Sequence, residues 1–209
     1  MLADARPLLA AAPVIPVLTI KDASVAVPLA RALVAGGLPV IEVTLRTPQA
    51  LSAIREIARE VPEAVVGAGT ITRVEDIQVA TAAGARFLVS PGTPAALAVG
   101  LSSCPVPVLP GCATVTEAMA LAAYGFTALK FFPAEPSGGA AFLKSLSGPL
   151  PGLVFCPTGG IDAAKAPSYL ALANVGAVGG SWVVPDDALA SGDFARITRL
   201  AAEARALRP

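Results

Sequence analysis

Short apolar runs rich in β-branched residues alternate along the chain with longer stretches rich in Ala and Leu. Eight of these runs follow one another at intervals of about 19 to 26 residues, the length of one strand–helix unit in a compact parallel barrel. They begin near Val14, Val40, Val65, Phe87, Val106, Thr127, Leu153 and Ala177. The runs are apolar throughout, as is typical of strands covered on both faces. The pattern therefore predicts an α/β fold, a (β/α)8 TIM barrel, with a doubly wound open sheet as the alternative.

Capping residues indicate where the helices between these runs begin and end. Segments 72–75 (T-R-V-E) and 114–117 (T-V-T-E) both match the capping box. Thr47 and Thr93 each precede a proline, an arrangement that favours a helix start. A last helix is predicted from about Asp193 to Leu207.

No linker or change of composition divides the chain, so residues 1–209 are predicted to form a single barrel domain. Hydrophobic residues make up 55% and charged residues 14%, but no stretch approaches the roughly 20 apolar residues of a membrane helix. Asp4 and Pro7 interrupt the region that would form the apolar part of a signal peptide. The first residues are therefore expected to form a short helix or arm, and no membrane partner is expected.

Charge and residue types limit the partners and the chemistry. The net charge is zero and there is no basic run, so a nucleic-acid partner is not expected. Cys104, Cys112 and Cys156 form no C-x-x-C pair and are odd in number, which favours buried thiols in a cytoplasmic protein over disulfides. The chain has no histidine, so histidine triads and histidine metal ligands are excluded, and neither a metal nor a cofactor is expected.

The most distinctive polar residues directly follow predicted strands, where barrel enzymes carry their active sites. Lys130 is the first of these, because it lies within an apolar run and precedes two phenylalanines. The other lysines lie in or beside helices with polar neighbours, as solvated lysines do: Lys21, Lys144 and Lys165. Burial favours a neutral amine, the form that attacks a ketone. The alternatives are a lysine that extends out of the barrel or one that pairs structurally with Glu42 or Glu135.

Glu42 lies between Ile41 and Val43, and strand alternation places it inside the barrel if its neighbours face the helices. A carboxylate there needs a partner or a task, and Lys130 offers the first while proton transfer is the second. A purely structural ion pair is the alternative. Arg46 follows on the same segment and suits a substrate carboxylate, with the hydroxyl of Thr70 beside it.

Two glycine pairs follow the last two predicted strands, Gly159-Gly160 and Gly179-Gly180, and Ser181 comes directly after the second. Barrels often bind phosphate with these two loops, because glycines let backbone N–H groups approach the anion. Lysine, glutamate, arginine and a phosphate site together suit a phosphorylated 2-keto acid that is cleaved through an imine. Two rivals remain open, a phosphate-binding isomerase or epimerase and a non-catalytic barrel that binds phosphometabolites.

Five segments resemble the 2-keto-3-deoxy-6-phosphogluconate (KDPG) aldolase family, whose members also act on 4-hydroxy-2-ketoglutarate. They are E-V-T-L-R-T (42–47), V-G-A-G-T (66–70), K-F-F-P-A-E (130–135), F-C-P-T-G-G-I (155–161) and G-G-S-W (179–182). The resemblance runs from about Val14 to the C-terminal helix, with the motifs in order. It implies a (β/α)8 barrel, a homotrimer, and cleavage of KDPG to pyruvate and glyceraldehyde 3-phosphate.

The resemblance also implies roles for individual residues. Lys130 would form the Schiff base and Glu42 would be the general acid and base, while Arg46 and Thr70 would bind the pyruvyl carboxylate. The remaining substrate-binding positions would be Pro91 and Phe132 as walls, Thr158 near the sugar hydroxyls, and Gly159, Gly160, Gly180 and Ser181 at the phosphate. Thr158 favours the gluconate substrate over the alternative, 2-dehydro-3-deoxy-6-phosphogalactonate. Segment 110–114 (P-G-C-A-T) departs from the family pattern at Cys112, which is not a catalytic position.

Overall fold

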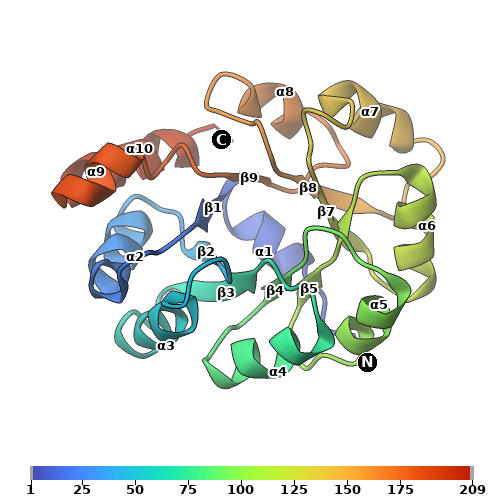
Figure 1. The fold of residues 1–209 in the computed structure, drawn as a ribbon. Helices are drawn as coiled ribbons and strands as arrows, with labels where there is room; N and C mark the ends of the chain where they lie inside the picture. Colours follow the sequence, from blue (N-terminus) through green and yellow to red (C-terminus); the bar gives the residue numbers. More distant parts are fainter. Residues whose placement is uncertain (1, 208–209) are drawn as a thin grey trace.

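The computed structural model describes residues 2–207, and its strands lie where the apolar runs predict them. The strands are β1 (Val14–Leu18), β2 (Val40–Thr44), β3 (Val65–Gly69), β4 (Leu88–Val89), β5 (Val108–Leu109), β6 (Gly111–Cys112), β7 (Ala128–Phe131), β8 (Val154–Pro157) and β9 (Val178–Gly180). All paired strands are parallel, in the orders β5-β4-β3-β2-β1-β9 and β6-β7-β8. Figure 1 shows them arranged as a ring with helices outside.

Pro110 divides the fifth barrel strand into β5 and β6. It has no N–H to donate to a ladder, but its carbonyl accepts from the N–H of Lys130 at 3.0 Å, so β7 pairs across the break. On the other side, a bridge between Thr158 and Gly179 joins β8 to β9. The ring therefore closes as eight barrel strands, which confirms the predicted single-domain (β/α)8 fold and excludes the open sheet.

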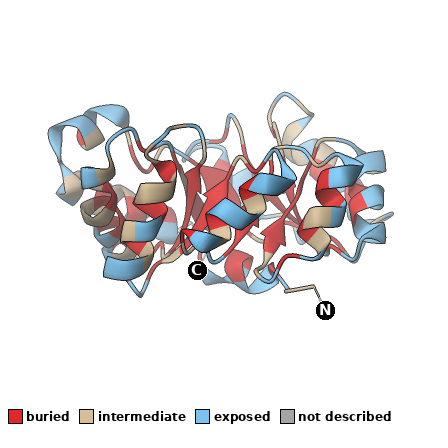
Figure 2. Cartoon of the chain, turned by 60° about the horizontal axis from the view of Figure 1, so that its bottom comes forward, coloured by how far each residue is buried: buried red, intermediate tan, exposed pale blue. Residues whose placement is uncertain are grey.

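Helices cover the outside of the ring, and Figure 2 shows their outward faces exposed while the strands are buried. They are the 3-10 turn η1 (Ala23–Val25), α2 (Ala26–Ala35), α3 (Ala50–Glu60), α4 (Val74–Ala82), α5 (Ala95–Ser102), α6 (Val115–Ala123), α7 (Gly139–Leu146), α8 (Ala166–Leu170), α9 (Asp186–Ser191) and α10 (Phe194–Arg205). The remaining helix, α1 (Arg6–Ala11), packs against the inside of the ring instead. Across residues 2–207, no helix is long and apolar enough to cross a membrane.

Strand alternation separates two apolar cores. Ile41 and Val43 of β2 belong to the larger core between strands and helices, whereas Val40 belongs to a smaller one inside the ring. The inner core also contains Leu8 and Leu9 of α1, the short N-terminal helix expected from the sequence. It follows that α1 closes the amino end of the barrel, while the carboxyl end remains available for polar residues.

Some of the predicted helix starts are correct and others are not. Thr114 caps α6 as predicted, because its Oγ1 accepts from the N–H of Glu117 at 3.2 Å and Glu117 accepts in return. The capping box predicted at 72–75 was wrong by one position. The Asp76 carboxylate accepts from the N–H of Arg73, so the box spans residues 73–76. The starts after Thr47 and Thr93 were also wrong, and α3 and α5 begin at Ala50 and Ala95. Both threonine hydroxyls instead donate to distant carbonyls: Thr47 to Ile20 and Thr93 to Gly111.

Thr72 and Thr114 both begin capping-box patterns in the sequence, but they differ in which part of the structure they stabilise. Thr114→Ala removes an N-cap and is expected to lower the free energy of unfolding by about 1 kcal/mol. Thr72→Ala is the matched control and should cost much less, because its hydroxyl lies 3.4 Å from Asp76 and caps no helix. Urea denaturation of both variants measures the difference, and equal losses would contradict this assignment of the caps.

Candidate active site

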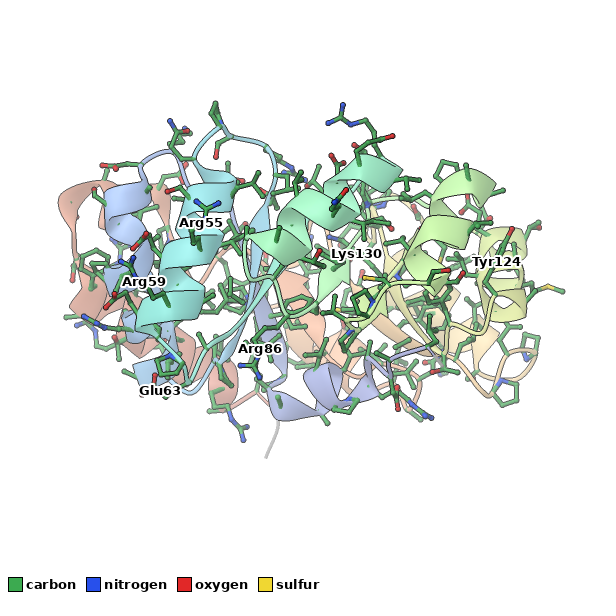
Figure 3. The ribbon with its side chains drawn as sticks, turned by 90° about the horizontal axis from the view of Figure 1, so that it is seen from below. Arg55, Arg59, Glu63, Arg86, Tyr124 and Lys130 are labelled. Atoms are coloured by element: carbon green, nitrogen blue, oxygen red, sulfur yellow. The ribbon has the colours of Figure 1, made fainter. Side chains whose placement is uncertain are left out.

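Lys130 and Glu42 form an ion pair inside the barrel. Lys130 lies on β7 and Glu42 on β2, and both side chains point inward because their strand neighbours belong to the outer core. The Lys130 Nζ lies 3.2 Å from the Glu42 Oε1, and the two side chains are 6% and 5% exposed. Figure 3 labels Lys130 within the layer of strands, whereas Arg55 and Arg59 lie on the outer helix α3. The inward orientation predicted for Glu42 is thus confirmed.

This pair carries two charges with almost no water around them. Each side chain depends on the other for a hydrogen-bonding partner, since removing one member of a buried pair leaves an uncompensated charge. A proton on the amine can also pass to the carboxylate within the existing hydrogen bond, which would leave a neutral amine and a neutral acid. The site therefore holds an amine that could act as a nucleophile in contact with a carboxylate that could accept its proton.

Gly69 leaves the space that the Glu42 carboxylate occupies. It lies on β3, the strand next to β2, and a Cβ there would come within 2.0 Å of the Glu42 Oε1. The clash would be with the carboxylate itself, which is held by Lys130. A glycine at this position is therefore a requirement of the ion pair.

Cys156 lies beside Lys130, its register partner on β8. Burial raises the pKa of the Cys156 thiol to about 12; Lys130 opposes this increase and Glu42 adds to it. Burial likewise raises the pKa of Cys112 to about 12, and its Sγ donates to the Lys130 carbonyl at 3.6 Å. Neither thiol ionises near neutral pH, so both are buried packing residues, as the sequence predicts for the cysteines. Lys130 is therefore the candidate nucleophile of this site.

Arg46 and Thr70 meet at the carboxyl ends of β2 and β3. The Arg46 Nε donates to the Thr70 Oγ1 at 3.3 Å, and the Arg46 side chain is otherwise exposed. Thr70 has a φ of 62°, the only left-handed residue other than glycine between residues 2 and 207. Such a conformation is disfavoured and is found mainly where function requires it. The pair presents a guanidinium and a hydroxyl together on the rim of the barrel.

A cavity of about 410 Å³ opens at this rim. Seven of the predicted site residues line it: Arg46, Phe132, Thr158, Gly159, Gly160, Gly180 and Ser181. Four do not: Lys130, Glu42, Thr70 and Pro91. Phe132 connects the two groups, because the Lys130 Nζ lies 5.4 Å from the centre of its ring. The ion pair therefore lies next to the cavity, behind the wall that Phe132 forms.

The two glycine loops form one side of the cavity. A Cβ on Gly179 would lie 2.2 Å from the Thr158 Oγ1, so the absence of a side chain lets the two loops approach each other. Gly180 similarly leaves room for the Trp182 ring. Directly after Ser181 and Trp182, Val183 and Val184 return the chain to the core.

Several residues at the cavity were not predicted. Lys21 and Asp186 both line it, although Lys21 was expected to be an ordinary solvated lysine. The signal was available, because Lys21 closely follows the carboxyl end of β1, where no site residue was predicted. Lys165 is exposed beside α8, as predicted, and its Nζ also forms an ion pair with Glu135 at 2.9 Å. Within the described part of the chain, no cluster of His, Cys, Asp and Glu residues could hold a metal ion.

The contact between Gly69 and Glu42 gives a direct test of the ion pair. Gly69→Ala is expected to displace the Glu42 carboxylate and to reduce catalytic turnover at least about tenfold, as misplacement of a catalytic group does. Gly148→Ala is the control, because no atom lies within 4 Å of a Cβ there. Steady-state kinetics and circular dichroism of both variants provide the measurement. A folded Gly69→Ala protein with normal turnover would show that Glu42 need not hold this position.

Comparisons with known proteins agree with the site. Residues 6–200 match the sequence profile of the family described as KDPG and KHG aldolase. The KHG/KDPG aldolase of Escherichia coli is 50% identical over 201 residues, covering 96% of this chain and 94% of that protein. The 2-dehydro-3-deoxy-phosphogluconate aldolase of Dickeya dadantii is 51% identical over the same length, with the same coverage of both proteins.

A solved structure is similarly close. The KDPG aldolase of Legionella pneumophila superposes with a TM-score of 0.93 and 43% identity, covering 96% of this chain and 97% of that one. Its crystal structure contains pyruvate captured at low pH as a covalent carbinolamine intermediate. Sequence profile, relatives and fold agree over nearly the whole chain, and the chain belongs to the KDPG and KHG aldolase family.

Proposed function

We propose that this protein is a class I aldolase that cleaves 2-dehydro-3-deoxy-6-phosphogluconate to pyruvate and glyceraldehyde 3-phosphate through an imine on Lys130. The same site would cleave 4-hydroxy-2-oxoglutarate to pyruvate and glyoxylate. The observation that carries the proposal is the buried contact between the Lys130 Nζ and the Glu42 Oε1 beside the rim cavity. The names of the relatives and the carbinolamine in the Legionella enzyme support the same chemistry.

The reaction begins with proton transfer within the ion pair. Lys130 gives a proton to Glu42 and its neutral amine attacks the C2 ketone, forming a carbinolamine. Glu42 returns this proton to the C2 oxygen, then takes a second proton from the Lys130 nitrogen and passes it to the same oxygen, so that water leaves and a protonated imine forms. The protonated imine accepts electrons, so the C3–C4 bond breaks once the C4 hydroxyl has lost its proton to Glu42. Glyceraldehyde 3-phosphate leaves, the enamine is protonated at C3, and water hydrolyses the imine to release pyruvate.

The remaining residues would hold the two ends of the substrate. Arg46 and Thr70 suit the pyruvyl carboxylate, because a guanidinium and a hydroxyl meet there within 3.3 Å. Phe132 and Pro91 would form walls beside the imine. Thr158 would contact the sugar hydroxyls and favour the gluconate over the galactonate substrate. The phosphate would lie on the last two glycine loops, at Gly159, Gly160, Gly180 and Ser181.

The family resemblance further leads us to propose a homotrimer, which sedimentation velocity can test directly. A cytoplasmic location fits the three free, buried cysteines, since reduced thiols are usual in that compartment. The proposed mechanism uses only side chains of the protein and needs neither a metal nor an organic cofactor.

Borohydride reduction in the presence of pyruvate tests the imine. The wild-type chain is expected to gain one adduct of pyruvate less one oxygen, and peptide mass spectrometry should locate it on Lys130. Lys130→Met should form no adduct and have no turnover, whereas the exposed Lys144→Met is the matched control and should behave as wild type. A folded wild-type protein that forms no adduct at high pyruvate would refute the aldolase and favour the isomerase, which needs no imine.

Replacement of Glu42 separates proton transfer from binding. Glu42→Gln keeps the size of the side chain and removes the proton acceptor, so kcat should fall by about 100-fold or more while KM changes little. Glu63→Gln, on the exposed turn after α3, is the control and should change neither constant. If Glu42→Gln instead raised KM and left kcat unchanged, Glu42 would bind substrate and would not transfer protons.

A further inference from the structure

Three side chains form a polar network behind the Gly159-Gly160 loop. The Glu135 carboxylate accepts from the Tyr169 hydroxyl through one oxygen and pairs with the Lys165 Nζ at 2.9 Å through the other. Tyr169 lies on α8 and is almost fully buried, while Lys165 precedes that helix and is half-exposed. None of the three side chains lines the rim cavity, so they do not belong to the site described above.

Two consecutive carbonyl groups of the loop are held from the side of the network, the first by a backbone N–H and the second by Lys165. The N–H of Glu135 donates to the Gly159 carbonyl at 3.1 Å, and the Lys165 Nζ donates to the Gly160 carbonyl at 2.9 Å. The Glu135 side chain also packs against Gly160, where a Cβ would lie 2.8 Å from its Cγ. Gly160 has a φ of 78°, which glycine adopts without strain. Glu135 and Lys165 therefore fix the loop through hydrogen bonds and through close packing.

Fixing these carbonyls also fixes the direction of the N–H groups that follow them. In a trans peptide the C=O of one residue and the N–H of the next point in opposite directions. The Gly159 and Gly160 carbonyls point toward the network, so the N–H groups of Gly160 and Ile161 point away from it. Between residues 2 and 207, neither N–H has a protein acceptor, and both residues line the cavity. Two adjacent backbone donors are thus available to an anion.

We propose that Glu135, Lys165 and Tyr169 are positioning residues that aim these backbone donors at the substrate phosphate and set the preference for phosphorylated substrates. The inference rests on the proposed aldolase function and extends it, because no group of the network needs to touch the substrate. Preorganised donors bind an anion without the cost of ordering a loop.

Lys165 could act in two ways, by positioning the loop or by attracting the phosphate directly. The charges of Glu135 and Lys165 distinguish the two. The Tyr169 hydrogen bond and the Lys165 ammonium hold the pKa of Glu135 below its ordinary value, and the hydrogen bond to Glu135 raises the pKa of Lys165. Both groups are therefore ionised at neutral pH, and each neutralises the other. If Lys165 attracted phosphate directly, loss of the Glu135 charge would strengthen binding. If the network positions the loop, loss of either partner weakens it.

The test compares a phosphorylated and an unphosphorylated substrate in the full chain. In Glu135→Gln and Lys165→Met, KM for 2-dehydro-3-deoxy-6-phosphogluconate should rise about tenfold, the change that the loss of one hydrogen bond to a charged group gives. kcat/KM for 4-hydroxy-2-oxoglutarate, which has no phosphate, should stay within about twofold of wild type. Lys165→Arg keeps a cationic donor and should restore much of the lost affinity. Glu56→Gln breaks the exposed pair with Arg59 and is the matched control, expected to change neither substrate.

Two results would overturn the proposal. Equal losses on both substrates would mean that the network only supports the fold, and tighter binding of the phosphorylated substrate by Glu135→Gln would make Lys165 a direct phosphate ligand. Pyruvate trapping on Lys130 is measured in the same variants and should be unchanged, because pyruvate carries no phosphate. Absence of trapping in the wild-type protein would instead refute the imine chemistry on which the inference rests.

Discussion

The ion pair between Lys130 and Glu42 is the constraint on which the rest of the structure depends. Two charges inside a barrel are costly to desolvate, and a partner at 3.2 Å is what offsets that cost. The pair requires β2 and β7 to present these residues inward at the same level, and it requires a glycine at position 69, because any Cβ there would occupy the place of the carboxylate. The inner core below the pair is apolar and includes Leu8 and Leu9 of α1. The polar chemistry is therefore confined to one rim.

At that rim, backbone conformation determines what the side chains can do. Thr70 adopts a left-handed conformation and accepts a hydrogen bond from Arg46, while the Gly160 loop is tied from behind by Glu135 and Lys165. These two features follow β3 and β8, at separate places around the ring, where our proposal puts the two ends of the substrate. A flexible 2-keto acid held at both ends has its ketone restricted to the space between them, beside Phe132 and the buried amine. Precise placement of this kind is what makes an intramolecular attack much faster than an encounter in solution.

Much of this was accessible from the sequence, because the signals were local. β-Branched runs marked the strands, alternation placed Glu42 inside, and two glycine pairs pointed to the loops that line the cavity. The predictions failed where residues in a pattern typical of a helix start form hydrogen bonds with distant parts of the chain. Thr47 and Thr93 resemble helix caps, but their hydroxyls donate to carbonyls of other barrel units, so the helices begin later. The bond between Tyr169 and Glu135 joins residues 34 positions apart and has no local signature at all.

A chain with no net charge and no histidine can still suit a substrate that carries a carboxylate and a phosphate, because binding depends on the groups at the cavity. Lys130 is paired with Glu42 and Lys165 with Glu135, so these lysines add little net positive charge to their surroundings. The charged residues that line the cavity are two cations, Lys21 and Arg46, and one anion, Asp186, which leaves an excess of one positive charge. One charge does not balance a carboxylate and a phosphate, and backbone N–H groups must supply the remainder. Because such donors act only over short distances and in fixed directions, the placement of the glycine loops matters more for this site than the total charge of the protein.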